Sequence, residues 1–125
     1  MAWRIVESYI LLIRIEAMLA FRSLTALHAW VRTRETRRDR RAGARSVDEL
    51  CVAMDWACSF YPKRVLCLQR SAATTILLRR HGAAAEMVIG AQILPFKSHA
   101  WVEVGRVVVN DKPYIEEIYR ELERC

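Results

Sequence analysis

The sequence has no uninterrupted run of about 20 apolar residues, the length that a transmembrane helix needs. Charged residues divide the apolar N-terminal region into short runs, at Arg4, Glu7, Arg14, Glu16 and Arg22. The same charges, together with the lack of a small-residue cleavage site after them, argue against a secretory signal peptide. We therefore expect a cytoplasmic protein without a transmembrane segment.

Cysteines at metal-ligand spacing are also lacking. The four cysteines, Cys51, Cys58, Cys67 and Cys125, form no CxxC pair and have no neighbouring histidine that would complete a zinc motif. Free thiols in a reducing compartment are the expected state of these residues. The sequence gives no reason to expect a metal or another cofactor.

Positive charge is concentrated in one short segment. The chain has 20 Lys and Arg against 14 Asp and Glu, and residues 32–45 alone hold seven arginines and two acids. Clustered arginines neutralise phosphates, so a basic nucleic-acid-binding module is one alternative. No interleaved aromatic residues, glycine-rich loop or helix-turn-helix pattern accompanies the arginines, so a solvated linker is the preferred interpretation and nucleic acid is not an expected partner.

A length of 125 residues with 54% apolar residues predicts a single compact domain. Residues 1–45 are expected to form an amphipathic helix over 3–31 and the Arg-rich linker, and residues 46–125 the core. In the helix, apolar side chains such as Ile5, Tyr9 and Leu12 lie opposite Arg4 and Arg14. Two interpretations stay open: the apolar face packs on the core, or it docks on a partner or membrane surface.

The rest of the chain predicts helices, then strands, then one helix. Ser46 and Glu49 match a capping box before a helix over 47–60, and a further helix over 66–80 ends at Gly82. The β-branched segments 85–93, 99–104 and 106–110 predict strands, with a hairpin turning near Gly105. Residues 114–124 are expected to form the final helix. The fold class is α+β, with an antiparallel sheet packed on the helix over 66–80.

Three side chains have positions that suit one reaction. Cys67 is at a helix start, where unpaired amides and the helix dipole favour a thiolate. His99 opens a strand, and the hairpin brings Asp111 back beside it. A thiol paired with an imidazole that a carboxylate orients is the arrangement for acyl transfer through a thioester.

The segments CLQRSAATTILLRRHG and VIGAQILPFKSHAWVEVGRVVVND carry a resemblance to a known family. They are similar to the transglutaminase-like cysteine peptidases of lasso peptide biosynthesis, the leader peptidases called B proteins. The matching pieces include Cys67 with Arg70 and Ser71, the run from His99 to Glu103, and Asp111 after an asparagine. The final hairpin is one residue shorter than is common in the family. The resemblance implies a transglutaminase-like or papain-like core.

The resemblance also implies a reaction and its residues. Cys67 is the expected nucleophile, His99 the general base and acid, and Asp111 the orienter of the imidazole. The substrate is a precursor peptide, cleaved between leader and core. The chain leaves no room for a fused leader-binding domain, so a separate small leader-binding protein is an expected partner, and the downstream lactam-forming cyclase is a further candidate. Transfer to an amine instead of water, as transglutaminases perform it, stays open as an alternative.

Several further residues are weaker candidates. Oxyanion stabilisation by Gln69 or Gln92 is one expectation, next to the backbone amide of Cys67. Arg70 lies one turn from Cys67 and is expected either to support the thiolate, to bind substrate or to form a surface ion pair. Trp101 is expected on the same face as His99, where it either shields the imidazole or packs in the core. His28 has no metal-ligand neighbours and is expected to be structural.

Overall fold

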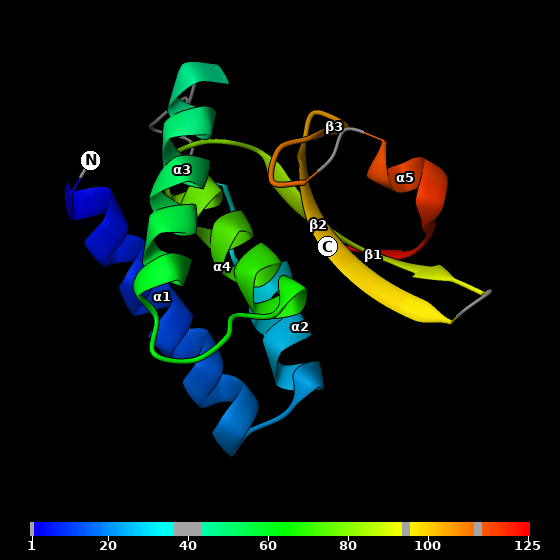
Figure 1. The fold of residues 1–125 in the computed structure, drawn as a ribbon, viewed down its shortest axis with the longest axis horizontal. Helices are drawn as coiled ribbons and strands as arrows, with labels where there is room; N and C mark the ends of the chain where they lie inside the picture. Colours follow the sequence, from blue (N-terminus) through cyan, green and yellow to red (C-terminus); the bar gives the residue numbers. More distant parts are fainter. Residues whose placement is uncertain (1, 37–43, 94–95, 112–113) are drawn as a thin grey trace.

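One helix lies between a layer of helices and a small sheet (Figure 1). The computed structural model describes residues 2–36, 44–93, 96–111 and 114–125. This central helix is α4, Cys67–Arg80, and its residues from Ser71 to Arg79 are all buried. On one side it contacts α1 (Ala2–Phe21), α2 (Leu24–Thr33) and α3 (Ala44–Phe60), and on the other it contacts the sheet. The expected α+β class is therefore confirmed.

The N-terminal region forms two helices, so the prediction of one helix over 3–31 is wrong. Ser23 has an extended backbone and its hydroxyl accepts a hydrogen bond from Ala26 N at 3.1 Å. Serine at this position satisfies one of the unpaired amides of a new helix start. The chain consequently turns back after α1, which brings α2 against α4.

The first helix is apolar on two sides, which differs from the expected amphipathic pattern. Leu11, Leu12 and Ile15 on α1 are buried in the core together with Leu27 and Val31 on α2. The packing interpretation of the N-terminal region is therefore the one observed. A second set of apolar side chains on α1 is exposed: Trp3, Val6, Ile10 and Ile13. Among the described residues, no helix combines the length and the apolar character needed to cross a membrane.

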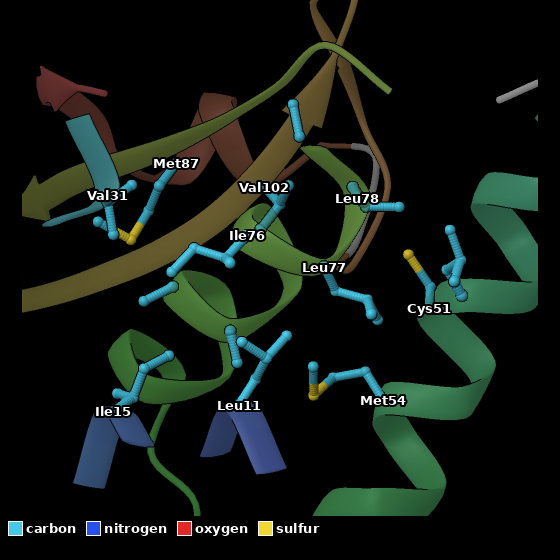
Figure 2. Packing of buried hydrophobic residues seen from close by; sticks show 14 of the residues in the cluster. Leu11, Ile15, Val31, Cys51, Met54, Ile76, Leu77, Leu78, Met87 and Val102 are labelled. Atoms are coloured by element: carbon cyan, nitrogen blue, oxygen red, sulfur yellow. The ribbon is translucent and has the colours of Figure 1, made fainter. Parts of the chain in front are cut away.

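The core is built where α1, α3, α4 and the sheet meet (Figure 2). The expected core residues of α3 are buried: Val47, Leu50, Cys51, Met54 and Ala57. This helix already includes Ala44, so Ser46 lies inside its first turn and the predicted capping box at that residue is wrong. The third predicted helix is confirmed as α4, and Gly82 follows it with a φ of 89°, the left-handed geometry that ends helices.

The sheet has the order β3-β2-β1-β4, and its pairs are antiparallel. Strand β1 (Ala85–Gln92) pairs with β2 (Lys97–Val104), which in turn forms the predicted hairpin with β3 (Val107–Val108). The turn between β2 and β3 consists of Gly105 and Arg106, which both have positive φ, at 58° and 67°. Positive φ at both residues is what a two-residue hairpin turn of type I′ requires.

The C-terminal segment is not the predicted helix over 114–124. Only a short helix, α5 (Ile115–Ile118), forms there, and β4 (Arg120–Arg124) then pairs with the edge of β1. Helix propensity is a weak preference that tertiary pairing overrides. Here β4 forms backbone hydrogen bonds with β1. The pairing continues to Met87 and Cys125, which exchange two backbone hydrogen bonds of 2.7 and 2.8 Å.

Candidate active site

Cys67 is the first residue of α4, and the Gln69 side chain links this helix start to α1. The Gln69 side chain accepts a hydrogen bond from Leu66 N at 2.9 Å, and its amide nitrogen donates to Glu16 on α1 at 2.8 Å. The first amides of a helix have no partner inside the helix. The backbone amide of Cys67 therefore belongs to a set of donors that can stabilise negative charge beside the thiol.

His99 and Asp111 are in direct contact. His99 lies on β2 opposite Gly90 of β1, and its Nε2 is 2.5 Å from Oδ2 of Asp111, which follows β3. Both side chains are mostly buried, with 24% and 22% of their surface exposed. Because Asp111 contacts Nε2 of the imidazole, this contact leaves the other ring nitrogen, Nδ1, unused.

Cys67 and His99 line the same cavity, which has a volume of about 260 Å³. The side chains around it are mainly aliphatic: Leu24, Leu68, Ile89 and Leu122. The structure thus brings together the three residues that the sequence singled out, two of them in the cavity wall and Asp111 behind the imidazole. Among the described residues, no three His, Cys, Asp or Glu side chains are grouped closely enough to hold a metal ion.

The three other thiols are held in their protonated form. Burial raises the pKa of the Cys51 thiol to about 11, with a smaller contribution from the Asp55 carboxylate. Burial also raises the pKa values of Cys58 and Cys125. At neutral pH these thiols are poor nucleophiles, because the thiolate is the reactive form.

A hydrogen-bond network joins the three segments that carry the candidate residues. Ser71 lies one turn after Cys67, and its buried hydroxyl donates to the carbonyl of Ala100, which follows His99, at 3.0 Å. Asn110 precedes Asp111; its amide nitrogen donates to Ser71 Oγ at 3.3 Å and its oxygen accepts from Val102 N at 2.7 Å. Ser71 and Asn110 therefore set the spacing between α4, β2 and the Asp111 loop.

Two aromatic rings pack against the imidazole. His99 stacks on Tyr119 with ring centroids 5.2 Å apart and on Trp101 at 6.3 Å. Trp101 is buried and its indole nitrogen donates to Glu103 at 2.8 Å, and Glu103 pairs with Arg124 on β4 at 3.0 Å. Tyr119 was not identified from the sequence, because its segment was predicted as a helix with no relation to His99.

The weaker candidates have defined positions. Both ends of the Gln69 amide are used at the start of α4, which makes this side chain a support for Cys67. Gln92 is the last residue of β1, two positions beyond the partner of His99. Arg70 forms an ion pair with Asp55 on α3, so it joins two helices. Trp101 is a core residue whose ring stacks on His99.

Comparison with known proteins identifies the family of the chain. The family model of the transglutaminase-like superfamily matches residues 11–124 of the chain. The chain is also similar to the microcin J25-processing protein McjB of Escherichia coli, with 43% identity over 51 residues. That similarity spans 41% of this chain and 24% of the relative, and no solved structure gives a significant match. The resemblance drawn from the sequence is thereby confirmed, and the chain belongs to the transglutaminase-like superfamily.

Proposed function

We propose that this protein is a cysteine peptidase that removes the leader from a ribosomally made lasso peptide precursor. One observation carries the proposal: Cys67 and His99 share a cavity, and the imidazole is held by Asp111 at 2.5 Å. Thiol, imidazole and carboxylate in this order are the parts needed for nucleophilic catalysis through a thioester. The similarity to a protein named for processing microcin J25 supports a peptide precursor as the substrate class.

In the first half of the proposed reaction, His99 Nδ1 takes the thiol proton and the Cys67 sulfur attacks the carbonyl carbon of the last leader residue. Asp111 holds the ring and stabilises the imidazolium that forms. The carbonyl oxygen becomes negatively charged, and the Cys67 amide at the start of α4 is the proposed first donor to it. The imidazolium then protonates the amine of the core peptide as the carbon–nitrogen bond breaks.

In the second half, water resolves the thioester. His99 removes a proton from the water molecule as the water oxygen bonds to the thioester carbon, and the carbon–sulfur bond then breaks. The leader leaves as a carboxylic acid that releases its proton to solvent. The thiolate recovers its proton from the imidazolium, so the enzyme returns to its starting state. An amine that reached the thioester in place of water would give transamidation, which is the alternative chemistry of the superfamily.

The size of the cavity supports the need for a partner. A volume of about 260 Å³ accommodates residues around the cleaved bond and not a whole leader. The exposed stripe on α1 offers an apolar docking surface, because Trp3, Val6, Ile10 and Ile13 follow each other at alternating spacings of three and four residues. That spacing suits a helix of a partner protein. We propose a separate leader-binding protein as its occupant; part of the arginine segment, residues 37–43, lies outside the described residues.

Incubation with the precursor peptide encoded nearest to its gene, followed by mass spectrometry of the products, tests this function. The proposal expects a leader with a free C-terminal carboxylate and an intact core peptide, and no products with Cys67→Ala. A leader coupled to an added amine would favour the acyltransferase alternative. An uncleaved precursor in the presence of the partner protein would overturn the peptidase assignment.

A further inference from the structure

A second cavity lies outside the candidate active site, where α1, α2 and α4 meet. Its volume is about 410 Å³, and neither Cys67 nor His99 lines it. The charged residues in its wall are four arginines and one glutamate: Arg14, Arg34, Arg79, Arg80 and Glu35. The apolar part of the wall is formed by three side chains: Leu11, Trp30 and Ile76. The cavity therefore combines an excess of positive charge with an apolar surface.

Arg79 places a positive charge in the protein interior without an ion-pair partner. The residue is 8% exposed, and no carboxylate among the described residues forms an ion pair with it. Its guanidinium donates to three backbone carbonyls: those of Ala85 at 2.9 Å, Val31 at 2.5 Å and Arg34 at 3.1 Å. Burial lowers the pKa of Arg79, while Cys125 and Glu86 act in the opposite direction. A buried cation costs free energy unless an anion compensates it, so this charge favours an anion in the cavity beside it.

Two exposed guanidinium groups in the wall are held by an aromatic ring instead of a carboxylate. The Cζ atoms of Arg14 and Arg34 lie 5.2 and 5.3 Å from the centroid of the Trp30 ring, which is cation–π distance. Neither side chain forms an ion pair with a described residue. The ring contact restricts the positions of both guanidinium groups and leaves their N–H donors available to another acceptor.

The other two charged residues of the wall do not cancel this excess. Arg80 is paired with Glu7 on α1 at 3.3 Å, so its charge is already compensated. Glu35 is the carboxylate among the described lining residues, and it stands against the three remaining arginines. Positive charges that line one cavity repel each other, and a bound anion would turn this repulsion into attraction. The charge of the wall therefore predicts an anionic ligand.

We propose that this cavity binds a small organic anion. Arg14 and Arg34 donate hydrogen bonds to its phosphate or carboxylate group, because the guanidinium fork matches two oxygens of such a group. The charge of Arg79 adds to the attraction, and the apolar body of the ligand packs against Trp30 and Ile76. A volume of about 410 Å³ is in the range of small-molecule sites. The proposal is independent of the peptidase function, because no residue of this wall takes part in the proposed reaction.

Titration with four probes tests the site: phenyl phosphate, benzoate, inorganic phosphate and benzyl alcohol. Calorimetry measures each Kd, and nitrogen–proton NMR of labelled tryptophans, assigned with Trp30→Phe, locates the binding. Phenyl phosphate or benzoate should saturate one site and shift the Trp30 indole signal, and the tighter of the two shows whether the ligand carries a phosphate or a carboxylate. Inorganic phosphate and benzyl alcohol each lack one half of the ligand and should bind at least about tenfold more weakly. No saturable binding of either aromatic anion, or equal affinity for inorganic phosphate and phenyl phosphate, would overturn the proposal.

Substitution of single arginines separates this site from general attraction to a basic protein. Arg14→Gln and Arg34→Gln should each weaken binding of the tighter probe about tenfold, the effect of one hydrogen bond to a charged group. Arg64→Gln is the matched control, because Arg64 is exposed, lies between α3 and α4 and does not line the cavity. It removes the same charge and should leave the Kd within about twofold. The tryptophan spectra of the free variants check the fold. Unchanged affinity in both Arg14→Gln and Arg34→Gln, or an equal loss in Arg64→Gln, would overturn the site.

Discussion

Gly90 lies so close to Trp101 that no side chain fits at this position. Because Trp101 stacks on His99, a substitution of Gly90 tests how packing affects the proposed active site. A Cβ added there would lie 2.7 Å from Cη2 and 2.9 Å from Cζ3 of Trp101, and 3.0 Å from the carbonyl oxygen of Arg120. Ordinary carbon contacts begin near 3.4 Å, so the indole would have to move by about 0.7 Å. Trp101 is held at its other end by Glu103 and stacks on His99, so the displacement reaches the imidazole.

We therefore predict two measurable effects of Gly90→Ala. Overpacking a core of this kind costs about 1–3 kcal/mol in the free energy of unfolding. A misplacement of about 1 Å in a catalytic group costs about a hundredfold in rate, so a loss of tenfold or more in kcat is expected. Urea unfolding measures the first effect, and precursor cleavage at saturating peptide measures the second.

Gly105→Ala is the matched control. Gly105 has a φ of 58° and no atom within 4 Å of an added Cβ, so the substitution strains the turn by about 1–2 kcal/mol without touching the site. It should lower stability and leave kcat unchanged. Combining Gly90→Ala with Trp101→Phe, which removes the clashing ring atoms, should cost less than the two changes added together. If Gly90→Ala kept the kcat of Gly105→Ala, the proposed link between Trp101 and His99 would be refuted.

Four further predictions follow from the site and its surroundings. Cys67→Ala should abolish leader cleavage, whereas Cys58→Ala and Cys125→Ala retain most of it; cleavage by Cys67→Ala would contradict the nucleophile assignment. His99→Ala should be nearly as damaging, and Asp111→Asn less so, because an amide still holds the ring but does not stabilise the imidazolium; the order of the three kcat values checks this. The raised pKa of Cys51 contributes stability that is fully present below its ordinary pKa of 9.0 and is lost as the pH rises through about 11; urea unfolding of wild type and Cys51→Ala across that range should show the steeper decline in the wild type. A leader-binding partner should accelerate cleavage by raising the local substrate concentration, and high salt should weaken the effect if the arginine segment takes part; an equal rate without the partner would contradict this.

The parts of the fold that local sequence signals determine could be predicted. Three such signals act within a few residues: the helical spacing of apolar side chains from Val47 to Ala57, the helix end at Gly82 and the turn at Gly105. The helices and the hairpin that these signals predict are present. The proximity of the candidate residues could also be predicted, because a helix start, a strand and a hairpin bring Cys67, His99 and Asp111 to one place.

The parts that depend on distant partners could not be predicted. The segment RELER has good helix formers, and only the open edge of β1 and the pairing of Arg124 with the buried Glu103 make it a strand. Glu123 lies on that strand and Tyr119 directly precedes it, so the contacts of neither residue were predicted. The position of His28 in the cavity wall was not predicted either, because it depends on both the break at Ser23 and the C-terminal strand.

Intact-mass spectrometry of an acid-quenched reaction tests the central claim most directly. Mixing the protein with its precursor and quenching within the first turnover should reveal a covalent adduct with the mass of the leader acyl group. Digestion should locate that adduct on Cys67, and His99→Ala should reduce its rate of formation. Cleavage that proceeds with no adduct in the wild type and continues in Cys67→Ala would contradict the thioester mechanism.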